Sequence, residues 1–168
     1  PANTSTAAIG QSDNLFTPIQ LAAYTMTLAN DGVRYKTHLV KSIRSYDGVE
    51  TVVEPEIAAK VKLSKEAIDA VREGMVKASS STGTARQFVN AKYSVATKTG
   101  TAQLVQSRSD HGVFIAYAPV EKPEVAIAVL LEHGSPRPAV DLTKEILDFY
   151  FESKSEGQAP TPEGVLLP

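Results

Sequence analysis

The run from Val125 to Leu131 constrains the fold more than any other segment, because it consists of seven consecutive apolar residues. A short run of this kind predicts a strand that is buried on both faces. Two more strands are expected before it, at 94–105 and 113–118, separated by the polar loop 106–111. Short connections between neighbouring strands favour antiparallel pairing, so we expect a three-stranded antiparallel sheet.

Helices are expected before and after this sheet in the sequence. Thr17 and Pro18 are typical of a helix start, with the hydroxyl as N-cap and the proline at the first helical position. Asn30-Asp31-Gly32 predicts the end of that helix, since Gly32 can adopt the left-handed conformation. A second helix is expected after Ser64, with an apolar side made of Ala67, Ile68, Val71, Met75 and Val76. A closing amphipathic helix is expected over 140–151, with one face made of Val140, Ile146, Leu147 and Phe151.

The remaining segments are expected to be extended or irregular. The stretch 33–53 predicts extended pieces at Leu39-Val40, Ile43 and Val52-Val53, with Tyr46-Asp47-Gly48 as a hairpin turn. Residues 79–84 predict a flexible polar connection. Residues 152–168 are rich in Pro, Glu, Gly and Ser and predict a disordered tail. The expected fold class is therefore α+β, an antiparallel sheet flanked by helices over residues 1–151.

Composition excludes several functions. The formal net charge of -2, without a run of Lys or Arg, argues against a polyanion-binding surface, so nucleic-acid binding is not expected. The absence of cysteine excludes disulfides, thiol catalysis and cysteine-based zinc sites. There is no apolar run long enough to span a bilayer and no basic and apolar leader after Pro1, so we expect any anchor or signal to lie outside this chain.

The tetrapeptide Lys98-Thr99-Gly100-Thr101 is the most informative about chemistry. Lys98 supplies a fixed positive charge, and the hydroxyls of Thr99 and Thr101 are donors for a carboxylate. Gly100 lets a substrate backbone approach closely. A strand edge at this point can pair with an extended peptide and offer a backbone N–H to an oxyanion. Taken alone, the same four residues also fit a polar turn between strands.

The surroundings of this tetrapeptide resemble the transpeptidase domain of class B penicillin-binding proteins. Lys-Thr-Gly is one of three motifs of the penicillin-recognising serine enzymes. The other matching stretches are 8–11, 17–22, 30–32, 38–40, 83–85 and 111–119. They follow the family's order from residue 8 to about 151 and resemble most the elongation-type or sporulation-type enzymes of Gram-positive bacteria. The resemblance implies that residues 1–151 are the C-terminal portion of a penicillin-binding/β-lactamase-like transpeptidase domain.

The resemblance also implies a serine acyl-enzyme mechanism. In such enzymes an active-site serine attacks the D-Ala-D-Ala end of a peptidoglycan stem peptide, and an amine of a second stem peptide resolves the acyl-enzyme into a cross-link. β-Lactam antibiotics acylate the same serine. These reactions take place on the extracytoplasmic face of the bacterial cell membrane, and no metal or organic cofactor is implied.

By position in the motif, the resemblance assigns a role to each residue. Lys98 would hold the electrostatics of the site and help to relay a proton. Thr99, Gly100 and Thr101 would bind the substrate or β-lactam, with its carboxylate on the two threonine hydroxyls. The backbone N–H of Thr101 would form half of the oxyanion hole.

The family's nucleophile motif, Ser-x-x-Lys, is absent, because no serine of this chain has a lysine three residues later. We therefore expect the nucleophile in the upstream half of the same domain, before Pro1, and expect this chain alone to be inactive. Ser12-Asp13-Asn14 mimics the family's second motif, Ser-x-Asn. It lies directly before the Thr17-Pro18 helix start, however, where a loop or capping serine is favoured over a site role.

Alternative interpretations stay open. A β-lactam sensor domain shares the Lys-Thr-Gly strand but generally lacks the Gly-Gln to Leu-Ala stretch found here at 10–22. A non-catalytic scaffold of the wall-synthesis machinery predicts a replaced serine or lysine upstream. Two separately produced pieces would split the sheet and leave an open strand edge in this chain.

Two further groups of residues are ambiguous. His38, His111 and His133 are scattered, which favours loop and strand-end positions over a metal site, although His111 is a candidate for a minor substrate contact. Residues 81–85 fit either a cleft lining or a linker between a helix and a strand.

Overall fold

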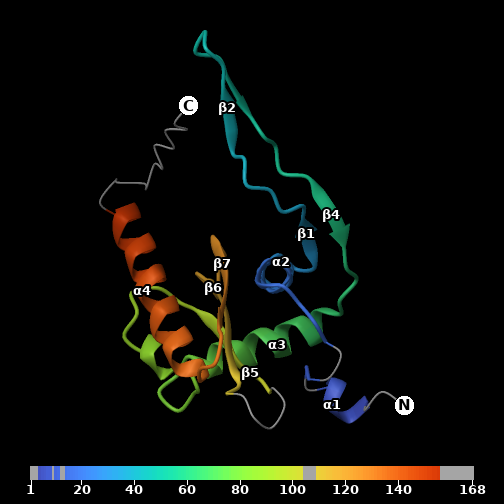
Figure 1. Ribbon diagram of the computed structural model, residues 1–168, viewed down its shortest axis with the longest axis vertical. Coiled ribbons are helices and arrows are strands. Elements are labelled where there is room, and N and C mark those ends of the chain that lie inside the picture. The colour runs from blue at the N-terminus through green and yellow to red at the C-terminus, as the bar shows by residue number, and fades with distance from the viewer. Residues whose placement is uncertain (1–3, 9, 12–13, 104–108, 156–168) are drawn as a thin grey trace.

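The computed structural model describes residues 4–8, 10–11, 14–103 and 109–155. In chain order its elements are α1 Thr4–Ala8, α2 Pro18–Ala29, β1 Val33–Tyr35, β2 Ser42–Arg44, β3 Glu50–Val52, β4 Ile57–Lys60, α3 Lys65–Ala78, the 3₁₀ turn η1 Arg86–Phe88, β5 Ala96–Ala102, β6 His111–Ala118, β7 Val125–Leu131 and α4 Pro136–Ser155. The predicted α+β class is confirmed, with helices on both sides of an antiparallel sheet (Figure 1).

The main sheet has the strand order β5-β6-β7, and both pairs are antiparallel. Because side chains alternate across a strand, β6 contributes to two cores. Phe114 and Ala116 pack with Val140 and Leu147 of α4, whereas Tyr117 packs on the opposite face with residues of α2 and α3. Figure 1 shows α4 on one side of the sheet and α2 on the other.

The strand β7 differs from the prediction of full burial on both faces. Helices α2 and α4 both contact it, but each of its seven residues is only half-buried. The reason is its place in the sheet, because β7 pairs with β6 alone among the described residues. An edge strand exposes one row of backbone groups and the flanks of its side chains.

The predicted start of α2 is confirmed by a complete capping box. Thr17 accepts a bond from the backbone N–H of Gln20, and the Gln20 side chain accepts one from the N–H of Thr17. The helix ends before Asn30, and Gly32 adopts φ +87, as its predicted left-handed position requires. A Cβ on Gly32 would lie 2.4 Å from the carbonyl oxygen of Val61. The chain passes so close to Gly32 at Val61 that no side chain fits at position 32.

The predicted apolar faces of α3 and α4 are only partly correct. Ser64 caps α3 through the N–H of Ala67, and Ile68 and Met75 are buried, but Ala67, Val71 and Val76 are exposed. In α4, Val140 and Leu147 are buried and Phe151 is half-buried, whereas Ile146 is exposed. The helix begins earlier than expected, at Pro136, and Ala139 and Thr143 complete its buried face.

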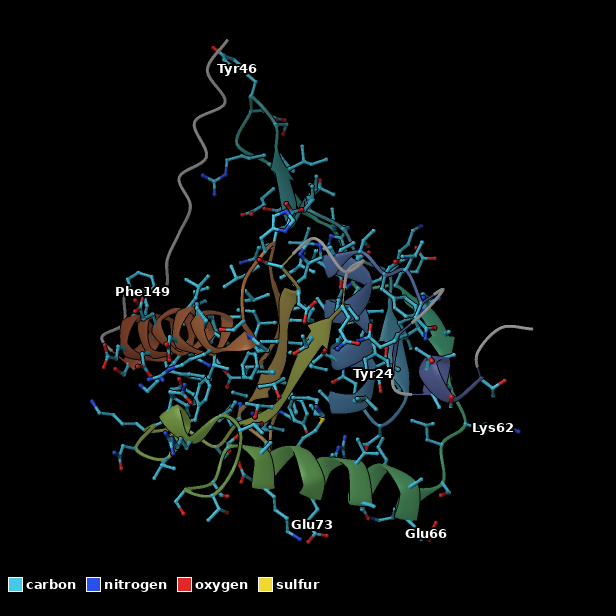
Figure 2. The ribbon with its side chains drawn as sticks, turned by 60° about the horizontal axis from the view of Figure 1, so that its bottom comes forward. Tyr24, Tyr46, Lys62, Glu66, Glu73 and Phe149 are labelled. Atoms are coloured by element: carbon cyan, nitrogen blue, oxygen red, sulfur yellow. The ribbon has the colours of Figure 1, made fainter. Side chains whose placement is uncertain are left out.

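Residues 33–60 form an arm that extends away from the main sheet (Figure 1). The predicted hairpin is confirmed, since β2 pairs with β3 around the turn at Tyr46-Asp47-Gly48. The extended pair Leu39-Val40 lies outside any strand, and β1 instead pairs with β4. The exposed Tyr46 marks the tip of the arm (Figure 2).

The C-terminal end of the described chain is helical. Residues 152–155 belong to α4, so the predicted tail does not begin at 152, and residues 156–168 lie outside the described residues. Among the helices that the structure describes, none has the length and apolar character needed to cross a bilayer.

Candidate functional site

The Lys98–Thr101 tetrapeptide lies inside strand β5 and not in a turn. Its four residues pair in register with Ile115, Phe114, Val113 and Gly112 of β6. This placement removes the alternative of a polar turn between strands. Among the described residues β5 has no second partner strand, so the tetrapeptide occupies an open sheet edge.

The outward edge of β5 is identified by the contacts of Gln11. Its side-chain amide donates to the carbonyl oxygen of Thr101 at 3.0 Å and accepts from the backbone N–H of Gln103 at 3.3 Å. In an antiparallel strand the N–H and C=O of one residue point to the same side. The N–H of Thr101, and by alternation the backbone groups of Thr99, therefore face the open edge.

Lys98 brings its charge to the same edge. Its Nζ donates to the carbonyl oxygen of Thr99 at 2.5 Å, and its side chain is exposed. Packing also favours a glycine at position 100, because a Cβ there would lie 3.3 Å from the Cβ of Val113. A side chain at this position would therefore press against β6.

The Thr99 hydroxyl contacts the turn that follows α3. It donates to Thr84 Oγ1 at 3.4 Å. The segment 79–84 was predicted to be a flexible polar connection, and the structure shows hydrogen bonds that link it to the segment around β5. The buried Ser79 hydroxyl bonds to the Val95 carbonyl at 3.0 Å and to Thr97 Oγ1 at 2.9 Å, which ties the turn to β5.

Gly83 explains how closely the turn packs. A Cβ on Gly83 would lie 2.1 Å from the carbonyl oxygen of Ala78, and the N–H of Ala85 donates to that same oxygen at 2.8 Å. The turn therefore folds back against the end of α3 and presents Thr84 to β5. Of the two predicted roles for 81–85, cleft lining is the one that this geometry supports.

A cavity of about 570 Å³ opens between this turn, β5 and the start of α4. Gly83, Thr84, Arg86, Gln87, Thr99, Pro136, Arg137 and Val140 line it. Its charged lining residues, Arg86 and Arg137, are far apart in the sequence, and nothing in their local patterns places them beside Thr99. Gln11 was likewise noticed only as part of a family-like stretch. These contacts depend on tertiary packing and have no local sequence signal.

The three histidines do not assemble into one site. The rings of His111 and His133 lie 5.2 Å apart, and His111 Nδ1 accepts the backbone N–H of His133 at 3.0 Å. His38 bonds instead to the Val40 carbonyl in the arm. Within the described residues there is no group of three metal-ligating side chains. Ser12 and Asp13 lie outside the described residues, so Ser12 stays a predicted loop or capping serine.

Comparison with known protein families gives one match over nearly the whole chain. The model of the "Penicillin binding protein transpeptidase domain" matches residues 2–148. Penicillin-binding protein 2A of Bacillus subtilis is 35% identical over 170 residues, which is 89% of this chain and 24% of that protein. The peptidoglycan D,D-transpeptidase MrdA of Acinetobacter baumannii is 30% identical over 168 residues, 91% of this chain and 25% of that protein.

Solved structures agree with this match. Penicillin-binding protein A from M. tuberculosis, in its imipenem acyl-enzyme complex, superposes with a TM-score of 0.70 at 27% identity, covering 84% of this chain and 33% of that one. The chain spans about a quarter of the length of the curated relatives described here. The matched relatives do not show to which subclass of penicillin-binding protein this chain belongs. Its assignment to the elongation or sporulation type of Gram-positive bacteria therefore stays a prediction.

Proposed function

The chain belongs to the penicillin-binding protein transpeptidase domain family, and from this premise we propose that it supplies the Lys-Thr-Gly side of the active site of a serine D,D-transpeptidase. The observation that carries the proposal is the open edge of β5, where the backbone groups of Thr99 and Thr101 and the ammonium of Lys98 meet. An extended stem peptide ending in D-Ala-D-Ala pairs with this edge as an added strand.

The proposed reaction proceeds in two acyl transfers. The serine oxygen bonds to the carbonyl carbon of the penultimate D-Ala, and the terminal D-Ala leaves as a protonated amine. An amine of a second stem peptide then bonds to the same carbon, and the serine leaves with a proton. The products are one new peptide cross-link and a regenerated serine.

Each residue of the tetrapeptide has a proposed part in this chemistry. The N–H of Thr101 faces the open edge and donates to the oxyanion of each tetrahedral intermediate. The hydroxyls of Thr99 and Thr101 hold the substrate carboxylate, and Lys98 stabilises negative charge and helps to relay a proton. Gly100 keeps the strand narrow enough for the peptide to approach.

The nucleophile is proposed to come from a Ser-x-x-Lys helix in the upstream half of the domain, which makes that half the chain's first partner. Residues 1–151 then form the C-terminal portion of one transpeptidase domain, and β-lactams are ligands of the joined site. We place this site on the extracytoplasmic face of the cell membrane, with the anchor outside this chain. The relative from M. tuberculosis forms an imipenem acyl-enzyme, which supports the β-lactam part of the proposal.

Labelling with a fluorescent penicillin tests the proposal. The chain alone is expected to take no label, whereas addition of the upstream half is expected to give label on that half. The Lys98→Ala variant should lower the rate of labelling by at least ~100-fold, as loss of a charge-stabilising or proton-relaying group does. The matched control is Lys62→Ala, because Lys62 is exposed and points outward before α3 (Figure 2).

The outcomes separate the open interpretations. Label on this chain itself would mean that it contains a nucleophile, and would overturn the proposed split of the site. Label without release of D-Ala from a stem-peptide substrate would identify a sensor or binding domain. An upstream half that never takes label would favour a non-catalytic scaffold.

A further inference from the structure

The side chain of Gln11 already occupies part of the β5 edge that the stem peptide is proposed to use. Its amide donates to the Thr101 carbonyl oxygen at 3.0 Å and accepts from the Gln103 backbone N–H at 3.3 Å. A strand added to β5 would bond to these same two groups, because a sheet edge presents its outward N–H and C=O groups in one row. One side-chain amide thus stands where the peptide groups of a neighbouring strand would lie.

The backbone of Gln11 is held in place for this contact. Its N–H donates to the Thr6 carbonyl at 3.1 Å, and the N–H of Gly10 donates to the Ala7 carbonyl at 3.0 Å. With Gly10 at φ +83, these two bonds form the Schellman ending of α1. The Asn14 side chain in turn donates to the Gln11 carbonyl at 3.0 Å. Because the backbone is fixed from both sides, the Gln11 side chain loses little further freedom when it reaches β5.

Gln11 and the peptide compete for the Thr101 carbonyl. In the proposed reaction the Thr101 N–H donates to the oxyanion at the penultimate D-Ala, and the terminal carboxylate lies toward Thr99. This direction makes the peptide antiparallel to β5. In a hydrogen-bonded antiparallel pair the facing residues exchange both bonds, so the N–H of the penultimate D-Ala donates to the Thr101 carbonyl. The preceding part of the peptide then runs along the edge toward Gln103, where the Gln11 amide lies.

We propose that Gln11 is a specificity-determining residue, which fills the β5 edge in the absence of peptide and is displaced only by a ligand that bonds to both the N–H and the C=O of Thr101. The inference rests on the proposed function, because it concerns the same peptide. A ligand with an N–H at the penultimate residue replaces the bond that Gln11 gives up. A ligand that offers only an acceptor would leave the carbonyl unbonded, so it does not displace Gln11.

The test titrates the full 168-residue chain, labelled with ¹⁵N, with N-acetyl-D-alanyl-D-alanine and with O-acetyl-D-lactyl-D-alanine. In the second ligand an ester oxygen replaces the N–H of the penultimate residue. The peptide is expected to shift the side-chain amide signals of Gln11 toward those of an exposed glutamine. It should also speed hydrogen exchange at the Gln103 N–H, which loses its acceptor. The ester analogue is expected to change neither signal.

The variant Gln11→Ala removes the competing amide. It should raise the affinity for the peptide about fivefold, because the Thr101 carbonyl is then free in every chain. The affinity for the ester analogue should change by less than about twofold, since that ligand does not use the carbonyl. The matched control is Gln20→Ala, because the Gln20 side chain likewise accepts a backbone N–H bond, from Thr17 at 2.8 Å, but at the start of α2. It should bind both ligands as the unaltered chain does.

Backbone signals outside β5 show whether each variant is folded. Peptide binding with unmoved Gln11 signals would mean that Gln11 stays on the edge, and would overturn the proposal. An equal gain of affinity for both ligands would indicate a steric obstacle and overturn it too, as would a Gln11→Ala chain that binds the peptide more weakly or binds neither ligand. Penicillin labelling with the upstream half reads the proposed function separately, so the two can fail independently.

Discussion

The phenol of Tyr93 packs against α4. It donates to Asp148 Oδ1 at 2.9 Å, and its ring lies 4.5 Å from that of Phe151. Burial, together with the hydrogen bond to the Asp148 carboxylate and its negative charge, raises the pKa of Tyr93 well above its ordinary value. The folded chain therefore keeps this phenol protonated at a pH where an unfolded chain begins to ionise it.

This shift predicts a loss of stability in alkali. Because the folded pKa is above the unfolded one, the contribution of Tyr93 is fully present below the ordinary tyrosine pKa of about 10 and falls as pH rises above it. In urea unfolding between pH ~9 and ~11, Tyr93→Phe should flatten the decline in free energy of unfolding. A decline remains, because burial also raises the pKa of Tyr117.

The control for this experiment is Tyr46→Phe, at the exposed tip of the arm (Figure 2). Its free energy of unfolding should follow the unaltered chain at every pH. If the free energy of unfolding of Tyr93→Phe also followed that of the unaltered chain at every pH, the pKa of Tyr93 would not differ between the folded and unfolded chain. Attributing the loss of stability in alkali to Tyr93 would then be wrong.

The junction between β6 and α4 leaves no room for an additional side-chain atom at Gly112. Gly112 lies in β6, where an added Cβ would be 2.3 Å from the Ser135 carbonyl oxygen and 2.9 Å from the Pro136 nitrogen. Gly112→Ala should therefore push the start of α4 outward and lower the free energy of unfolding by about 1–3 kcal/mol, as overpacking does. It should also displace Arg137, which lines the cavity beside Thr99.

In contrast to Gly112, a glycine of α3 has space for an added side chain. Gly74 is helical, and an added Cβ there would meet nothing within 4 Å. Gly74→Ala should stabilise the chain by about 0.5–1 kcal/mol, because alanine has the higher helix propensity. Unfolding in urea measures both variants. If Gly112→Ala were as stable as the unaltered chain, α4 would have a freedom to move that the Ser135 contact does not allow.

The elements that were predicted correctly from the sequence are those with a local cause. Thr17 and Ser64 cap their helices through bonds to residues three positions away, and Gly32 ends α2 through its own backbone conformation. Strands β6 and β7 follow from apolar runs joined by a short connection. Such signals are complete within a few residues, so no knowledge of the remaining fold is needed.

The incorrect predictions concern partners far away in the sequence. Periodicity indicates one face of a helix but not what covers it, and Val71, Val76 and Ile146 are exposed although they lie on apolar faces. The closing helix was expected to begin at residue 140, but α4 begins at Pro136 and includes Pro138 in its first turn. Proline is tolerated in a first turn, where the N–H has no intrahelical partner.

The candidate site likewise combines residues that a local sequence signal predicts with residues that only tertiary packing brings together. The Lys98–Thr101 tetrapeptide was recognisable because its residues are consecutive. Gln11, Arg86 and Arg137 reach the β5 region from three separate segments, and only the packing of α4 and of the 79–85 turn against the sheet brings them there. A contact of this kind has no sequence pattern of its own.

At the scale of the whole molecule, two surfaces besides the β5 edge lack the cover that a closed domain provides. The strand β7 pairs on one side only among the described residues. In addition, large apolar side chains around the start of α2 are exposed, namely Leu15, Phe16, Ile19 and Tyr24. An open strand edge and an apolar patch both favour association with another chain.

The chain alone is therefore expected to self-associate. Sedimentation velocity should give a weight-average mass above the 18.0 kDa of one chain, rising with concentration, and the double variant Phe16→Ser/Ile19→Gln should lower it. Addition of the proposed upstream half should replace self-association with a one-to-one complex, because that half would pair with β7 and cover α2. The control is Leu39→Gln, which removes an exposed apolar side chain from the arm and should leave the mass unchanged. A strictly monomeric chain would mean that these surfaces are tolerated in water, and the proposal of a sheet shared with an upstream half would lose its physical basis.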